Sequence, residues 1–206
     1  SMAFWQWDRA KLHKLLDDHG MALVDMPISL SHVAPDKFNA TVEFCREFGV
    51  DFVFVPWFGD AKKPKDAWLK FADDMAAAAR KLAPHGIRMG FHNHQVEFTA
   101  KYDGVSPMEM FFARPELSFE LDVGHATLAG EDPVAVLKRI WGRVPSIHAK
   151  PGGGLSCGGE GDRNDWAGIL AACRAMGTRW AVVECETRRD TFADIDASAK
   201  FLASRI

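Results

Sequence analysis

What this 206-residue sequence lacks excludes several classes of protein. No apolar stretch approaches the roughly 20 residues that span a membrane, and the first residues lack the basic flank and apolar core of a signal peptide. No cluster of lysine and arginine stands out, and the formal net charge is -3, so a nucleic-acid-binding surface is not expected. The four cysteines form no CxxC pair, which favours reduced thiols. We therefore expect a cytoplasmic protein whose partners include neither nucleic acid nor a membrane.

The composition is that of an ordinary globular protein. Hydrophobic residues make up 48% of the chain and charged residues 26%, and the length suffices to bury a full core. No internal repeat and no linker interrupts the pattern. We therefore expect one domain over residues 1–206.

Helix-like and strand-like segments alternate along the whole chain. Apolar residues recur at helical spacing over 35–48, whereas 52–55 is a short apolar run typical of a strand buried on both faces. The pattern predicts helices over 8–19, 35–48, 65–83, 107–112, 132–141, 164–176 and 190–204, the last three capped by Asp132, Asn164 and Asp190. It predicts strands over 21–30, 52–55, 87–92, 117–122, 144–150 and 180–184, with His125 in the loop after the fourth. Alternation at these lengths indicates parallel β/α units.

The number of expected strands does not fit a closed barrel. Six strands are expected, whereas a (β/α)8 barrel needs eight. The chain also begins on a helix and not on a strand. Three hypotheses remain: two N-terminal β/α units are absent, the sheet stays open, or a second chain completes it.

Four of the expected strands end in residue types that bind metals or transfer protons. These segments read FHNH at 91–94, ELDVGH at 120–125, SIHAK at 146–150 and VVECE at 182–186. In a barrel of parallel strands all carboxyl ends meet on one face, so we expect these side chains to gather there. Carboxylates combined with imidazoles suit a divalent Mn, Mg, Co or Zn ion.

The two-residue period of a strand sorts these side chains by face. His92 and His94 share a face, and so do His148 and Lys150. Glu97 has the opposite parity to His92 and His94, and it reaches the same site only if the chain turns after His94. In such a site a cation acidifies a C–H bond beside a carbonyl, a glutamate shuttles the proton, and Lys150 stabilises an enediolate oxygen.

Each motif also has a purely structural interpretation. A His-x-His pair recurs by chance, and Asp122 before Val-Gly-His can be a turn with an N-cap. His148 can be a satisfied core histidine, and Glu184 the buried partner of an arginine. The occurrence of all four motifs at the same place in successive β/α units favours a shared site.

A glycine-rich loop at 151–162 follows the fifth expected strand. It is not a P-loop, because no Gly-Lys-Ser/Thr sequence follows. We interpret it as a mobile lid over the strand ends, with a backbone cradle for a phosphate or sugar as the alternative. Cys157 in this loop is expected to be exposed, whereas Cys45 and Cys173 lie on apolar helix faces. Trp57, just after the second strand, can stack on a sugar ring or belong to the core.

Together these segments resemble the sugar phosphate isomerase/epimerase family, the xylose-isomerase-like TIM barrels. The segment GFHNHQVEF at 90–98 is similar to the family's Tyr/Phe-His-Asn-His-x-x-Glu-Phe, and WGRVPSIHAK at 141–150 to its Pro-Gly-Arg-x-x-x-x-His-x-Lys. The segments 120–133, 159–166 and 182–184 follow in the family's order. Pro151 departs from the aspartate that usually follows His-x-Lys.

The resemblance implies an α/β fold of the (β/α) TIM-barrel type that lacks its first two β/α units. It also implies a divalent metal ion held by two glutamates, an aspartate and a histidine. The matching positions are Asp122, His148 and Glu184. Gly90 stands where several epimerase branches have the first glutamate, so Glu97 is the substitute, with His92 or His94 as the alternative.

The resemblance further implies individual roles. Proton transfer falls to Glu184 or Glu97. The further catalytic groups are His94 and Lys150. The residues expected to contact substrate are His92, His125, Trp57 and Glu160.

The expected function is that of an isomerase or epimerase acting on a small sugar, keto-sugar or sugar derivative through an enediolate, with a homo-oligomer as one possible assembly. If Glu97 does not reach the site, a one-base isomerase or a dehydratase acting on a keto-sugar or keto-inositol is favoured. Two further alternatives are a non-catalytic truncated barrel subunit and a metal-dependent abasic-site endonuclease. The acidic balance counts against the endonuclease.

Overall fold

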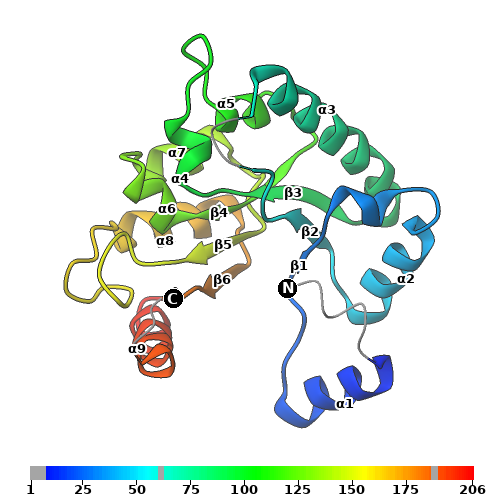
Figure 1. Ribbon diagram of the computed structural model, residues 1–206. Helices are drawn as coiled ribbons and strands as arrows, with labels where there is room; N and C mark the ends of the chain where they lie inside the picture. The colour runs from blue at the N-terminus through cyan, green and yellow to red at the C-terminus, as the bar shows by residue number, and fades with distance from the viewer. Residues whose placement is uncertain (1–7, 60–62, 187–189) are drawn as a thin grey trace.

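A sheet of six parallel strands, paired in chain order, forms the centre of the molecule. The computed structural model describes residues 8–59, 63–186 and 190–206. The sheet curls into a half-barrel with helices on its outer side (Figure 1). Its strands are β1 (Met26–Pro27), β2 (Phe52–Val55), β3 (Arg88–His92), β4 (Ser118–Asp122), β5 (Ser146–Ala149) and β6 (Trp180–Val183). The expected α/β architecture of six parallel strands is confirmed.

Helices precede the sheet and connect its strands. The helix α3 lies against β3, α7 lies beside α8, and α9 follows the last strand (Figure 1). The α-helices are α1 (Arg9–His19), α2 (Phe38–Phe48), α3 (Lys65–Leu82), α4 (Gln95–Thr99), α5 (Pro107–Phe112), α6 (Val123–Leu128), α7 (Pro133–Arg139), α8 (Trp166–Met176) and α9 (Thr191–Ala203). Two short 3-10 turns occupy Leu30–Val33 and Ala83–His85.

Side-chain caps fix where the helices begin. Asp190 accepts a hydrogen bond from the backbone N–H of Ala193 and caps α9, as expected. The cap of α8 is Asp165, which accepts from the N–H of Gly168. The expectation that Asn164 caps this helix is wrong, because its side chain donates to the carbonyl of Lys150 instead.

The hydrophobic core lies between the outer face of the sheet and the helices. On the central strands Phe91, Phe119 and Ile147 point outward, and none of them is exposed to solvent. The phenyl ring of Phe91 packs against that of Phe111 in α5, with ring centroids 4.4 Å apart. All four residues of β2 are buried, as expected of a strand with both faces covered.

Opposite walls of the half-barrel touch across its interior. The hydroxyl Oγ of Ser146, at the start of β5, lies 2.9 Å from Oδ2 of Asp25, which precedes β1. Near the amino ends of the strands, Arg179 forms an ion pair with Asp51. The two edge strands β1 and β6 therefore belong to walls that meet through side chains, although they share no backbone pairing.

The structure corrects several expected boundaries. The first strand covers Met26–Pro27 and not 21–30, and Pro27 is tolerated there because β1 is an edge strand. The helices α4 and α6 were not expected, because each is short, follows closely on a strand and lacks the proline that marks the start of α5. His125 therefore lies in the first turn of α6 and not in a loop.

The glycine-rich loop 151–162 is anchored by Asp162. Its carboxylate accepts hydrogen bonds from the backbone N–H of Gly152 and of Gly158, at 2.7 and 2.6 Å. Cys157 is buried, contrary to expectation, and its thiol donates to the carbonyl of Ala149. These contacts tie the loop to the sheet and argue against a freely mobile lid.

Candidate metal and acid–base site

The carboxyl ends of the strands bring four ligand-type side chains together. One nitrogen or carboxylate oxygen of each lies within 4.8 Å of those of the others. The four residues are His92, Asp122, His148 and Glu184. Three of them come from β3, β4 and β5, and Glu184 directly follows β6. The gathering of Asp122, His148 and Glu184 at one mouth of the sheet agrees with the strand-end argument.

The amide of Asn93 fixes the end of β3 against the end of β4. Its Nδ2 donates to the carbonyl of Asp122 at 3.1 Å, and its Oδ1 accepts from the N–H of Asp122 at 3.0 Å. Asn93 is fully buried, so this pair of hydrogen bonds is shielded from water. The asparagine of the His-Asn-His motif therefore sets the spacing between His92 and Asp122.

Asp122 has two tasks because it is also the N-cap of α6. Its Oδ1 accepts a hydrogen bond from the N–H of His125 at 2.6 Å, whereas its Oδ2 is buried without a partner. Gly124 allows this turn to lie against β5, since a Cβ there would come within 2.7 Å of the carbonyl oxygens of Lys150 and Pro151. The capped turn leaves one oxygen of Asp122 free for a ligand.

The imidazole of His148 lies between two carboxylates. Its Nδ1 is 2.8 Å from Oε2 of Glu184, and its Nε2 is 3.1 Å from Oε2 of Glu120. Burial alone would lower the pKa of His148, but the contacts with Glu120 and Glu184 outweigh it and raise that pKa to about 10. Without a bound cation, His148 is therefore an imidazolium that supplies the positive charge between these acids.

Asp122 and Glu184 divide one negative charge between them. Burial raises the pKa of Asp122 well above its usual value, and the neighbouring charge of Glu184 adds to this. Burial acts in the same direction on Glu184, but hydrogen bonds from His148 and Asp122 hold its pKa below its usual range. Of the two carboxyl groups, Asp122 is therefore the one that holds its proton to the higher pH.

Three further imidazoles line the mouth and are neutral. Burial lowers the pKa of His92 and of His94, and it lowers that of His125 to about 4. The ring centroids of His92 and His94 are 4.8 Å apart, and those of His94 and His125 are 4.9 Å apart. The Nδ1 atoms of all three are buried without a hydrogen-bond partner. Such nitrogens are available to a cation or to sugar hydroxyls.

Lys150 brings a buried positive charge to the same mouth. Its Nζ lies 2.5 Å from Oε2 of Glu186 and 3.9 Å from Oε1 of Glu184. Glu186 also approaches Nε2 of His125, at 3.9 Å. The ammonium group therefore sits among the groups expected to carry the chemistry.

A pocket of about 290 Å³ opens over these residues. Its apolar wall includes Pro27, Phe54 and Trp57, and its polar wall consists of His92, His94, His148 and Glu184. The indole of Trp57 is about half exposed and meets the ring of His94 edge to face at 5.0 Å. This volume is close to the lower end of the roughly 300–1,000 Å³ range of ligand pockets, so it suits a small ligand.

Two predicted site residues, Glu97 and Glu160, lie outside the four-residue group. The chain turns after His94, as the placement of Glu97 required, but Oε2 of Glu97 accepts the N–H of His94 at 2.7 Å. Glu97 is fully buried, and burial raises its pKa to about 7. Among the described residues, His92 and not Glu97 completes the four-residue group. Glu160 is an exposed residue of the anchored loop.

Gly90 explains why no glutamate occupies the first ligand position. A Cβ at Gly90 would lie 2.4 Å from the carbonyl oxygen of Ser118 and 2.7 Å from the ring of Phe52. A longer side chain does not fit between these strands. The place of that glutamate in the donor set is taken by the imidazole of His92.

The donor set fits a divalent cation. Two carboxylates and two imidazoles suit Mn, Co or Zn, and Oδ2 of Asp122 and Nδ1 of His92 are buried atoms that lack any other partner. The cluster could therefore hold such an ion.

Three polar residues behind His148 were not expected at the site. Glu120 is fully buried, and Ser146 and Asp25 adjoin it. Glu120 has the same strand parity as Asp122, and this signal could have placed it on the inner face. Asp25 could not be found in this way, because it reaches the site from across the half-barrel.

Comparison with known proteins places the chain in a family. The profile of the xylose isomerase-like TIM barrel matches residues 4–205. The chain belongs to this family. The expected resemblance is therefore confirmed over almost the whole sequence.

The similar curated proteins of the family are longer than this chain. An inosose dehydratase of Bacillus cereus is 29% identical over 90 residues, which are 42% of this chain and 29% of that protein. The rhizopine catabolism protein MocC of Rhizobium meliloti is 25% identical over 150 residues, which are 61% of this chain and 46% of that protein. The matched region thus spans less than half of either relative.

Solved structures of the family share the fold. A sugar phosphate isomerase/epimerase from Parabacteroides distasonis superposes with a TM-score of 0.77 at 22% identity, covering 92% of this chain and 74% of that one. An L-ribulose 3-epimerase superposes with a TM-score of 0.67 at 16% identity, covering 96% and 79%. At these identities the likeness concerns the fold alone.

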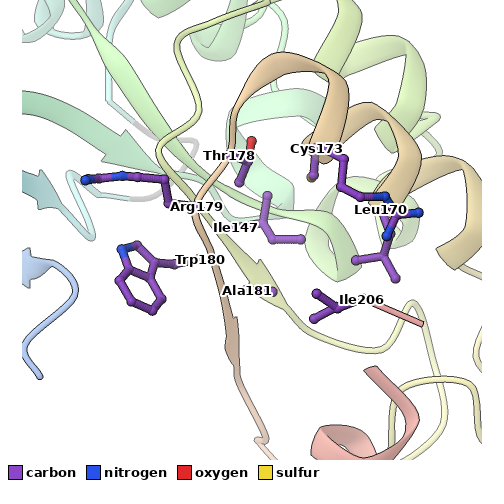
Figure 2. Close-up of a pocket in the computed structure, with 9 residues that line it drawn as sticks. Ile147, Leu170, Cys173, Thr178, Arg179, Trp180, Ala181 and Ile206 are labelled. Atoms are coloured by element: carbon purple, nitrogen blue, oxygen red, sulfur yellow. The ribbon is translucent and has the colours of Figure 1, made fainter. Parts of the chain in front are cut away.

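A second pocket lies on the outer side of β5 and β6, beside α8 (Figure 2). Ile147, Leu170 and Ala181 contribute apolar surface, and Cys173 adds a thiol whose pKa burial raises to about 11. Ile147 precedes His148 on β5 and therefore faces away from the polar mouth.

In the described parts of the chain, no helix is long and apolar enough to cross a membrane.

Proposed function

We propose that this chain carries the active site of a divalent-metal-dependent enzyme that moves a proton beside the carbonyl of a small sugar or keto-sugar. The observation that carries the proposal is the group His92, Asp122, His148 and Glu184, whose ligand atoms lie within 4.8 Å of one another. A cation held there would polarise adjacent carbonyl and hydroxyl oxygens and acidify the neighbouring C–H bond. The family to which the chain belongs and its epimerase-like neighbours in fold support a sugar substrate.

The surrounding side chains have the properties that this reaction needs. Glu184 is ionised and can accept the proton. Lys150 is buried beside it and can stabilise the developing negative charge on an enediolate oxygen. The neutral imidazoles of His94 and His125 can hydrogen-bond sugar hydroxyls, and Trp57 can cover one face of the ring.

An isomerase or epimerase is the first form of this proposal. Proton abstraction from one carbon and delivery to its neighbour, or to the other face of the same carbon, gives isomerisation or epimerisation. Delivery to the other face calls for a second acid–base group. Glu97 has a pKa of about 7, suited to such a task, but one of its oxygens is bound by the N–H of His94.

A dehydratase is the second form, and two observations favour it. Gly90 leaves no room for a glutamate opposite Glu184, so a single carboxylate base is in place. The curated relatives include inosose dehydratases. In this reaction Glu184 would remove the proton, and Lys150 would protonate the leaving hydroxyl group.

The experiment combines metal binding with proton exchange. Mn²⁺ binding is measured by calorimetry, and a panel of keto-sugars and keto-inositols is incubated in D₂O and followed by NMR and by ultraviolet absorbance. We expect Mn²⁺-dependent deuterium incorporation, with an enone absorbance only if the enzyme is a dehydratase. A folded protein that neither binds Mn²⁺ nor exchanges any proton would contradict the proposal.

A matched pair of aspartates isolates the site. Asp122→Asn keeps the cap on α6, because asparagine caps as well as aspartate. It should nevertheless weaken Mn²⁺ binding at least about 100-fold, since charged ligand oxygens dominate such sites. Asp165→Asn makes the same change at the cap of α8 and should leave binding unchanged. Equal affinities in the two variants would refute the assignment of Asp122.

A further inference from the structure

We propose that Glu120 is a positioning residue that holds the imidazole of His148 for cation binding, and that Ser146 and Asp25 hold Glu120 in turn. This inference rests on the proposed metal site. Glu120 lies outside the four-residue group, yet its side chain is completely buried in the middle of β4. A buried carboxylate is costly unless it is paired, so its partners indicate its task.

The two ring nitrogens of His148 face opposite sides. Nδ1 points toward Glu184, a member of the candidate metal group, and Nε2 points toward Glu120. A histidine that binds a metal through one nitrogen almost always offers the N–H of the other to a carboxylate or carbonyl oxygen. His148 therefore has Nδ1 on the cation side and Nε2–H on the side of Glu120. The ion-pair distance of 3.1 Å places Glu120 close enough to select that tautomer.

The second oxygen of Glu120 is held by a hydroxyl that two acids share. Oγ of Ser146 lies 3.0 Å from Oε1 of Glu120 and 2.9 Å from Oδ2 of Asp25. A hydroxyl has one hydrogen and can donate to only one of them. The other acid must supply a proton of its own for both contacts to be hydrogen bonds.

Asp25 is the acid that carries this extra proton. Burial and the neighbouring Glu120 carboxylate raise the pKa of Asp25 to about 7. Glu120 instead faces the positive charge of His148. The protonated Asp25 can donate to Ser146 while Ser146 donates to Glu120, so the hydrogen-bond chain runs Asp25 to Ser146 to Glu120.

This chain crosses the interior of the half-barrel. Asp25 lies just before β1, whereas Ser146 and Glu120 stand side by side in the register of β5 and β4. The support for His148 therefore comes from both walls of the sheet. If Glu120 had a purely structural role, its buried carboxylate would need only hydrogen-bond partners. Its position relative to the imidazole of His148 would then not affect a bound ion.

The experiment measures the metal site directly. Co²⁺ is titrated into the protein while its visible d–d absorption is recorded, and affinity is measured in parallel by calorimetry. Glu120→Gln should lower Co²⁺ affinity about 10- to 100-fold and shift the d–d bands, as loss of the carboxylate behind a ligand histidine does. Ser146→Ala leaves Glu120 in place but frees its second oxygen, so a smaller loss in the same direction is expected.

Ser118→Ala is the matched control. Ser118 is a buried polar residue two positions before Glu120 on β4, and it should leave both affinity and spectrum unchanged. Wild-type affinity and an unshifted spectrum in Glu120→Gln would overturn the inference while leaving the metal site standing. A folded wild-type chain that binds no Co²⁺ would instead remove the proposed function. Should Glu120→Gln fail to fold, Ser146→Ala decides by the same two readings.

Discussion

The two faces of the central strands differ in what they bury. On the outer face Phe91, Phe119 and Ile147 are completely buried against helices and carry no polar side-chain atom. On the inner face of the same strands, Glu120 and Asp122 are just as completely buried, but each carries an ionisable carboxyl group. Adjacent residues therefore meet opposite environments.

This difference separates stability from chemistry. Apolar burial on the outer face stabilises the fold, at about 25 cal/mol per Å² removed from water. Buried acids on the inner face cost free energy, and burial raises the pKa values of Asp122 and Asp25. Perturbed groups of this kind gather at functional sites, because a rigid scaffold can hold them. Changes to the two faces should consequently have different consequences.

The largest expected effect comes from the outer face. Phe119→Ala removes a ring that packs edge to face on Phe112, with centroids 5.2 Å apart. It should lower the free energy of unfolding by about 3–5 kcal/mol, because a cavity is left in a close-packed layer. Urea unfolding followed by circular dichroism measures this change.

A second phenylalanine provides the control for this prediction. Phe192 on α9 is 87% exposed, so Phe192→Ala should change the free energy of unfolding by less than about 0.5 kcal/mol. Similar losses in the two variants would show that the outer layer is not the source of stability. A folded Phe119→Ala protein should still bind Mn²⁺, since the inner face is untouched.

The fold was largely predictable because helix-like and strand-like apolar patterns alternate along the chain. The segment FVFV at 52–55 matches β2 residue for residue, and Pro107 at the start of α5 marks that helix correctly. The length of strand β1 was not predictable, since no pattern within the strand-like segment 21–30 marks the bounds Met26–Pro27. The helix α4 follows its strand too closely to show a period of its own.

The second prediction concerns the pH dependence of stability. The folded-state pKa of Asp25 is raised to about 7 from an ordinary value of 3.8. The unfolded chain therefore loses this proton first, and the free energy of unfolding should fall as the pH rises from about 4 to about 7. Three pKa units correspond to at most about 4 kcal/mol. Asp25→Asn, an uncharged substitute, should abolish this part of the slope.

Stability curves of the two proteins between pH 4 and pH 9 test this sign. The pKa of His148, raised from 6.5 to about 10, adds stability that is fully present below about pH 6.5 and falls as the pH rises toward 10, and both proteins share this slope. Asp36→Asn, at an exposed position, controls for the loss of one charge. Parallel curves for wild type and Asp25→Asn would mean that Asp25 is ionised throughout.

The candidate site was predictable where its residues end strands, and not elsewhere. The strand ends that carry Asp122, His148 and Glu184 were expected to meet, because parallel strands bring equivalent positions to one edge, and the family resemblance singled out these three residues. The fourth member depended on how the chain leaves β3, which the sequence did not reveal. Asp25 joins the site by a contact between residues 121 positions apart, and no local pattern reports such a contact.

The smallest of the three expected effects concerns the side-chain amide of Asn93. Asn93→Ala removes both hydrogen bonds to the backbone of Asp122, leaving a buried N–H and a buried carbonyl unpaired. It should lower the free energy of unfolding by about 1–3 kcal/mol. It should also weaken Mn²⁺ binding, because the spacing of His92 and Asp122 is no longer fixed. Thr99→Ala removes an exposed hydrogen bond within α4, so it should change neither quantity. Full Mn²⁺ affinity in Asn93→Ala would show that strand pairing alone sets the distance between these two ligands.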